Sequence, residues 1–118
     1  MAVPLKICCL GAGPASLYFS ILMKKRNPGN DITVIERGDR DSTWGFGVVF
    51  SDDTLKGLMD ADAASYKKIV EQFSYWGGID TKIHGKTINS KGHGFCGLSR
   101  LTLLNILHDR CEELGVNL

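Results

Sequence analysis

Two short apolar runs, separated by a helical pattern, stand out at the start of the chain. Residues 5–10 and residues 32–35 are mostly apolar, which indicates two strands. Residues 14–26 place apolar side chains at helical spacing between these runs. The helix side chains expected to face the sheet are Leu17, Ile21 and Leu22. The pattern predicts a strand–helix–strand core over residues 4–36.

Two short helices are predicted in the middle of the chain. Ser51 followed by two aspartates is typical of a helix start, and this helix is expected to run to about Met59. Asp62 is expected to cap a second helix, which the Trp76-Gly77-Gly78 sequence would end. The apolar face expected on this second helix carries Tyr66, Ile69, Val70 and Phe73.

The remaining residues predict short strands and one longer helix. Residues 79–98 alternate extended runs with Gly or Asn turns, which favours two or three short strands. Ser99 is expected to cap the last helix and Gly115 to end it, so this helix occupies residues 99–115. Its expected inner stripe is Leu101, Leu104, His108, Cys111 and Leu114. Residues 116–118 begin another extended run, and residues 51–98 form an insertion of helices and short strands.

A glycine-rich turn, Gly11-Ala12-Gly13-Pro14-Ala15-Ser16, joins the first strand to the first helix. Gly11 would permit the tight turn, and Gly13 would let a pyrophosphate approach the backbone. The free N–H groups at the start of the helix would face that pyrophosphate. Ser16 stands where Gly or Ala is usual, so the motif is imperfect.

An acidic residue, Glu36, ends the second strand, where a carboxylate can accept hydrogen bonds from the ribose hydroxyls of an adenosine. The order strand, glycine turn, helix, strand, acid predicts a Rossmann-like βαβ dinucleotide-binding unit. The predicted fold class is therefore α/β, with this unit extended by helices and short β-strands. The alternative is a strand-to-helix turn that binds nothing.

Two further segments have unusual sequences. In residues 44–50 two glycines are spaced by aromatic residues, which fits either a backbone close to a flat or bulky group or a short buried strand with a bulge. Arg100 lies in the first turn of the last helix, the end that disfavours a cation. It could hold a phosphate or a cofactor edge, or it could pair with a nearby acid.

The composition of the 118 residues is that of one ordinary globular domain with a net charge of +1. With no basic stripe and no apolar run long enough to span a bilayer, neither nucleic-acid nor membrane partners are indicated. The four cysteines favour a reduced, cytoplasmic protein with buried thiols. His84, His93 and Cys96 lack metal-ligand spacing, so no metal site is predicted, and the residues identify no catalytic nucleophile.

The chain resembles the N-terminus of FAD-dependent aromatic monooxygenases in Gly11–Ala15, in Leu17-Tyr18-Phe19 and in Glu36-Arg37. Further motifs resemble the branch that hydroxylates aryl-CoA thioesters, the salicyloyl-CoA 5-hydroxylase and anthraniloyl-CoA monooxygenase type. These motifs are Trp44–Asp52, Gly92-His93-Gly94-Phe95, Ser99-Arg100 and Arg110–Val116. The resemblance covers essentially the whole chain.

This resemblance implies a site for FAD. The pyrophosphate would lie over the glycine turn, the adenosine ribose on Glu36, and Arg37 beside the adenosine. Residues 45–49 would run beside the ribityl chain and the isoalloxazine, which Arg100 would reach from the start of its helix. The implied cofactor-binding residues are Gly11, Gly13, Pro14, Ala15, Ser16, Glu36, Arg37, Gly45, Phe46, Gly47, Val48 and Arg100.

The resemblance also implies an activity. In the complete enzymes NADH or NADPH reduces FAD, and the reduced flavin uses oxygen to hydroxylate a small aromatic substrate. Since such enzymes run to several hundred residues, we expect this chain to be their truncated N-terminal part, too short for catalysis alone. Two alternatives are a fragment of an NAD-linked dehydrogenase and a non-catalytic nucleotide-binding module. The module would associate with a partner chain through a strand edge near Val116.

Overall fold

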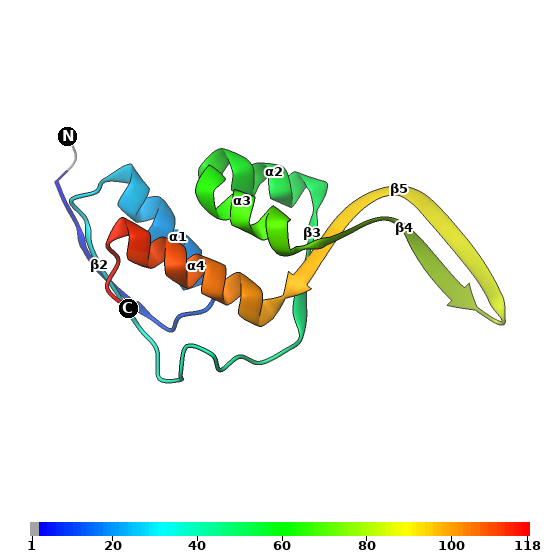
Figure 1. The fold of residues 1–118 in the computed structure, drawn as a ribbon, viewed down its shortest axis with the longest axis horizontal. Helices are drawn as coiled ribbons and strands as arrows, with labels where there is room; N and C mark the ends of the chain where they lie inside the picture. Colours follow the sequence, from blue (N-terminus) through cyan, green and yellow to red (C-terminus); the bar gives the residue numbers. More distant parts are fainter. Residues whose placement is uncertain (1–2) are drawn as a thin grey trace.

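The computed structural model describes residues 3–118 and arranges them as two small sheets with helices packed between them (Figure 1). Strand β1 (Lys6–Leu10), helix α1 (Pro14–Arg26) and strand β2 (Asp31–Ile35) form the predicted strand–helix–strand core. β1 and β2 are parallel, in register from Lys6 opposite Asp31 to Leu10 opposite Ile35. The α/β fold class expected from the sequence is confirmed.

The βαβ core is closed by one buried polar residue and by apolar packing. Asn30, only 2% exposed, accepts a hydrogen bond from the Leu5 N–H at 2.8 Å and donates to the Met23 carbonyl at 2.8 Å. It thereby ties the end of α1 to the start of β1. Leu17 and Ile21 of α1 are fully buried as expected, whereas Leu22 is only half-buried.

The end of the chain adds to the same sheet. Asn117 forms a parallel bridge with Thr33 on the side of β2 away from β1. Two backbone hydrogen bonds make this bridge, Val34 N–H to the Asn117 carbonyl at 2.8 Å and Asn117 N–H to the Ile32 carbonyl at 2.9 Å. The extended run predicted over residues 116–118 therefore pairs with β2, giving the third-second-first strand order of a nucleotide-binding half-sheet.

The second sheet is antiparallel, in the order β3-β5-β4, and comprises β3 (Gly47–Ser51), β4 (Ser74–Ile83) and β5 (Lys86–Ser99). Strands β4 and β5 form a long hairpin that projects from the helices (Figure 1) and makes the molecule 59 Å long. The tight turn of this hairpin places both His84 and Gly85 at positive φ, 47° and 74°.

Residues 79–98 lie in two strands, as the sequence predicts, but these strands are long and form one hairpin instead of being short. Another expectation about this region was wrong. The Trp76-Gly77-Gly78 sequence does not end a helix; it lies in β4, with a bulge between Trp76 and Gly78. The Trp76 ring stacks on Phe95 of β5, with centroids 6.2 Å apart, and a Cβ on Gly97 would lie 3.2 Å from it. This pairing across the sheet decides the local structure.

Of the two alternatives for residues 44–50, the structure tests only the short buried strand with a bulge. β3 pairs with β5 without a bulge, and Val49 is exposed, so the segment is a strand but not a buried, bulged one. Trp44 and Phe46 precede the strand in a loop and are 92% and 100% exposed.

The expectation of buried thiols holds for Cys96 and Cys111 but is wrong for Cys8, which is exposed because it lies on the open face of β1.

Three capped helices complete the fold: α2 (Asp52–Ala61), α3 (Ala63–Gln72) and α4 (Arg100–Leu114). Ser51, Asp62 and Ser99 cap their N-termini through side-chain oxygens, as the sequence predicts. Gly115 ends α4 in the left-handed conformation with φ 86°. The expected inner stripe of α4 is buried at Leu104, His108 and Cys111 but only half-buried at Leu101 and Leu114.

The helices are held together by a buried carboxylate. Asp62 is 0% exposed and accepts two hydrogen bonds from Arg110 of α4, Nε to Oδ2 at 3.0 Å and Nη2 to Oδ1 at 2.9 Å. Lys25 of α1 donates to Oδ1 at 3.0 Å, and the Ser65 N–H donates to Oδ2 at 3.2 Å. Burial alone would raise the pKa of Asp62, but these donors outweigh it and hold the pKa well below its usual range.

Replacing this carboxylate should destabilise the chain. We predict that Asp62→Asn lowers the free energy of unfolding at pH 7 by about 3 kcal/mol, because Arg110 keeps its charge without its buried partner. The folded pKa of Asp62 lies below the unfolded value of 3.8, so its contribution is complete above pH 4 and is lost as the pH falls further. Urea unfolding at a series of pH values should therefore show a flatter acid limb in the variant.

Asp60→Asn is the matched control, because Asp60 is exposed on the neighbouring helix α2. This variant should change the unfolding free energy by less than about 0.5 kcal/mol. Equal losses in the two variants would contradict the assigned role of Asp62.

Candidate functional site

The glycine turn after β1 leaves the start of α1 open. Gly11 has φ +94°, and its N–H donates to the Ile35 carbonyl at 2.7 Å, which joins the ends of the two parallel strands. Gly13 is the N-cap of α1, so no side chain caps this helix, and Pro14 follows at the first helical position. A Cβ at Gly13 would meet no protein atom within 4 Å. The space over Gly13 is therefore free for a group that approaches the backbone.

Glu36 reaches back from the end of β2 to this turn. Its Oε2 accepts from the Ala12 N–H at 2.7 Å, and its Oε1 accepts from the Gly38 N–H at 3.1 Å. The Ala12 hydrogen bond, followed by that of Gly38, lowers the pKa of Glu36. The ionised carboxylate retains unused lone pairs on both oxygens, so it can still accept from a ligand hydroxyl.

The loop between β2 and β3 is fastened to α4 by Arg40. Its guanidinium pairs with Asp109 and with Glu112, the latter at 3.4 Å between Nη1 and Oε1, and Nε donates to Asn105 Oδ1 at 3.3 Å. The hydrogen bond from Arg40 to Asp109 is the largest influence raising the pKa of Arg40. These contacts hold the loop across the face of α4.

Arg100 fastens the other end of the same loop. Its backbone N–H donates to the Phe46 carbonyl at 3.2 Å, and Nε donates to Thr43 Oγ1 at 3.1 Å. Within residues 3–118 it has no ion pair with an acid, so the pairing considered from the sequence is not found. Its guanidinium keeps unused donors beside the loop.

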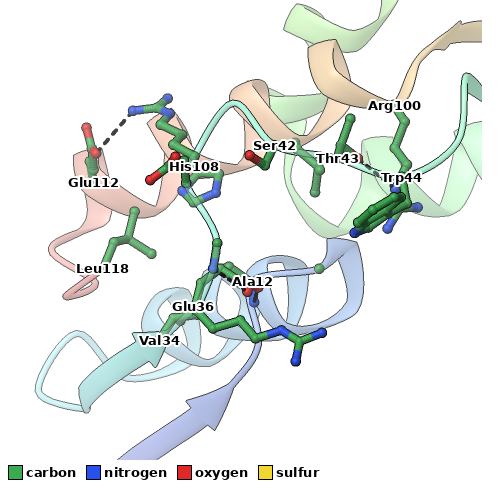
Figure 2. A pocket seen from close by; sticks show the side chains of 16 residues that line it. Ala12, Val34, Glu36, Ser42, Thr43, Trp44, Arg100, His108, Glu112 and Leu118 are labelled. Carbon is green, nitrogen blue, oxygen red and sulfur yellow. Dashed lines mark hydrogen bonds and ion pairs between the residues drawn. The ribbon is translucent and has the colours of Figure 1, made fainter.

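These three parts enclose a cavity of about 360 Å³ (Figure 2). The glycine turn and the end of β2 form one wall, residues 37–44 a second, and α4 a third. The α4 residues in the wall recur every fourth position, so that they form a single stripe along the helix. This stripe consists of Arg100, Leu104, His108 and Glu112.

The structure brings part of the predicted site together. Gly13, Glu36, Arg37 and Arg100 line the cavity. The other predicted residues lie next to it along the chain, in the glycine turn, in the first turn of α1, at the end of the loop or at the start of β3, without lining it. They are Gly11, Pro14, Ala15, Ser16, Gly45, Phe46, Gly47 and Val48.

Sequence reasoning did not identify several residues of the cavity wall. The sequence predicts no role for Arg40 or Thr43, places Trp44 in the segment of aromatic residues and glycines, and places His108 on the inner stripe of the last helix. The four-residue spacing from Arg100 to Glu112 was a usable signal for His108. No comparable pattern marks Arg40, because its role depends on where the loop meets α4.

The side chains that the structure describes contain no group of three or more His, Cys, Asp or Glu placed to hold a metal ion. Within residues 3–118, no helix has both the length and the apolar character needed to cross a membrane.

Comparison with known proteins identifies the class to which this fold and site are related. No family model matches. The chain is 37% identical, over 97% of its length, to salicyloyl-CoA 5-hydroxylase of a Streptomyces species, and covers 22% of that protein. It is 31% identical, over 95% of its length, to protodeoxyviolaceinate monooxygenase of Chromobacterium violaceum, and covers 30% of it. The chain is thus homologous to a segment of aromatic monooxygenases, and the predicted resemblance is confirmed.

A solved structure shares the fold. The tetrameric form of 2-methyl-3-hydroxypyridine-5-carboxylic acid oxygenase superposes with a TM-score of 0.82 at 21% identity, over 98% of this chain and 31% of that one.

A third relative by sequence is the 3-hydroxy-4-methyl-anthranilyl-[aryl-carrier protein] 5-monooxygenase of Streptosporangium sibiricum. It is 28% identical over 95% of this chain, which covers 32% of that protein. The chain therefore spans a third or less of each of these proteins.

The Arg40 contacts make a prediction about the loop. Arg40→Gln should speed hydrogen exchange of the Ser42 amide, which donates to the Asp39 carbonyl at 3.0 Å, by about tenfold, because the loop loses its attachment to α4. Since these ion pairs are partly exposed, global stability should fall by less than about 1 kcal/mol. Amide-resolved NMR exchange measures both quantities.

Lys68→Gln is the control, because it removes a similarly exposed ion pair, with Glu113, that lies outside the loop. It should leave the exchange of Ser42 unchanged. Unchanged Ser42 exchange in Arg40→Gln would show that Arg40 does not hold the loop.

Proposed function

We propose that this chain is the FAD-binding segment of an NADH- or NADPH-dependent flavin monooxygenase that hydroxylates a small aromatic substrate. The observation that carries the proposal is the unfilled space over Gly13, beside a carboxylate at the end of the second parallel strand. The homologues named as hydroxylase and monooxygenases support the reaction class. The names of two of them favour an aryl thioester, on CoA or on a carrier protein, as the substrate.

The residues present fit the cofactor. Ala15 and Ser16 lie in the first turn of α1, which has no side-chain cap, so their N–H groups and the helix dipole suit a pyrophosphate over Gly13. Glu36 can accept the ribose hydroxyls through its remaining lone pairs, with Arg37 beside the adenosine. The N-terminus of α1 would then hold the pyrophosphate and Glu36 the ribose. The adenosine and the flavin would extend from the pyrophosphate in opposite directions along the cavity.

The flavin half would continue toward the start of α4. Arg100 lines that end of the cavity. It lies close to Gly45, because a Cβ added to Gly45 would be 3.9 Å from the Arg100 Cδ. Its guanidinium and the backbone of residues 45–48 are the groups proposed to contact the ribityl chain and ring system. Bound FAD supplies the electron transfer and oxygen chemistry, while this chain supplies binding and orientation.

The charge of Glu36 bears on the alternative, an NAD-linked dehydrogenase fragment. A carboxylate at this position suits FAD or NAD and repels the 2′-phosphate of NADP. The homologues favour the flavin. We also propose that the protein acts in the cytoplasm, in keeping with four cysteines that form no disulfide among the described residues.

Titration with FAD tests this function. The purified chain should quench FAD fluorescence saturably, and NAD should compete at least tenfold more weakly. Gly13→Val should reduce FAD affinity more than tenfold, because its side chain fills the space proposed for the pyrophosphate. Glu36→Gln should weaken binding about tenfold, because the charge-assisted hydrogen bonds to the ribose are lost.

Gly57→Val is the matched control, because a Cβ at Gly57 of α2 also meets no atom within 4 Å but lies away from the cavity. It should bind FAD like the original chain. If a chain shown to be folded by circular dichroism binds neither nucleotide, or prefers NAD, the proposed function is overturned.

A further inference from the structure

His108 is a buried polar residue on the wall of the cavity. It lies on the lining stripe of α4 and is 9% exposed. No hydrogen bond joins either of its ring nitrogens to another of the residues that the structure describes. Neither nitrogen is a fully buried polar atom without a partner, so each is reached by solvent and can exchange hydrogen bonds with water or with a ligand. Because this side chain faces the cavity, a ligand there can do so.

The charge state of His108 suits a neutral ligand group. Burial, and then the nearby Arg40 guanidinium, lowers the pKa of His108 below its ordinary value of 6.5. The ring is therefore neutral at pH 7, with one nitrogen that donates and one that accepts. A neutral ring can accept a hydrogen bond from an amino group, which an imidazolium cannot.

The position of His108 identifies which part of a dinucleotide it would meet. Figure 2 shows it on the α4 wall, with Glu36 and Val34 on the opposite wall of the same cavity. It lies two helical turns, about 12 Å, from Arg100 along α4. A ribose held by Glu36 would therefore place its base near His108, while the flavin half extends toward Arg100.

The surroundings of His108 suit a flat base. Val34, Leu104 and Leu118 line the same cavity and supply apolar surface to it. Such surface can cover the faces of an aromatic ring and leave its polar edge to one hydrogen-bonding group. His108 is the neutral polar side chain of the α4 stripe in a position to meet that edge.

We propose that His108 recognises the adenine of the bound nucleotide by accepting a hydrogen bond from its 6-amino group. This inference rests on the proposed function, because it places the ribose on Glu36. It makes His108 a specificity-determining residue, which favours adenosine nucleotides over those with an oxygen at position 6.

Competition with two nucleotides that differ at position 6 tests the inference. ADP carries the amino group, whereas IDP carries a carbonyl oxygen, which cannot donate to the unprotonated nitrogen of His108 and could bond to the ring only if it presented its N–H instead. Each is titrated against FAD fluorescence quenching in the original chain and in His108→Leu. The original chain should bind ADP about tenfold more tightly than IDP, and the variant should bind the two within about twofold.

Two further variants separate recognition from packing. His108→Gln keeps a side-chain acceptor and should recover part of the preference for ADP. His84→Asn, at the exposed tip of the hairpin, should leave the preference unchanged. A purely structural role would make His108→Leu weaken ADP and IDP equally.

The outcomes distinguish this inference from the function on which it rests. If the original chain binds FAD and ADP but its preference over IDP survives in His108→Leu, the role of His108 is overturned and the function stands. If the folded chain binds neither FAD nor ADP, the proposed function fails, and the role of His108 fails with it.

Discussion

The buried carboxylate of Asp62 is the interaction on which the arrangement of the helices depends. It caps α3 through Ser65 and accepts from Arg110 of α4 and Lys25 of α1. Three helices that contribute few hydrogen bonds to one another are thereby held at one charged group. Because an ionised carboxylate is costly to bury without donors, the helices must bring these donors together.

This constraint determines the cavity as well as the stability. One wall is a face of α4, and the opposite wall belongs to the βαβ core. α4 has no backbone pairing with that core until Asn117 joins β2 beyond its end. The buried side chains Leu17, Ile21, Leu107 and Cys111 pack in one apolar cluster between them. Charge and packing together fix which stripe of α4 faces the glycine turn.

The sequence predicted the elements whose signals are local. The glycine turn, Pro14 at the start of α1, and the caps Ser51, Asp62 and Ser99 depend on residues a few positions apart, and the structure has them where the sequence places them. The start of the long hairpin was missed because Trp76 stacks on Phe95 across the sheet, a contact that no local pattern reveals. Within the site, Gly13 and Glu36 could be predicted because a known motif relates them. The four-residue spacing along α4 offered a signal for His108. Arg40 could not be predicted, because its role arises only where the loop meets α4.

The central claim is that a nucleotide occupies the cavity between the glycine turn and α4, and amide chemical shifts measured by NMR during a titration with FAD test it most directly. The account predicts the largest changes at Ala12, Gly13, Arg37, Arg100 and His108, with little change in the β4–β5 hairpin beyond Ile79. Changes concentrated in the hairpin or on α2, with the glycine turn unaffected, would contradict it.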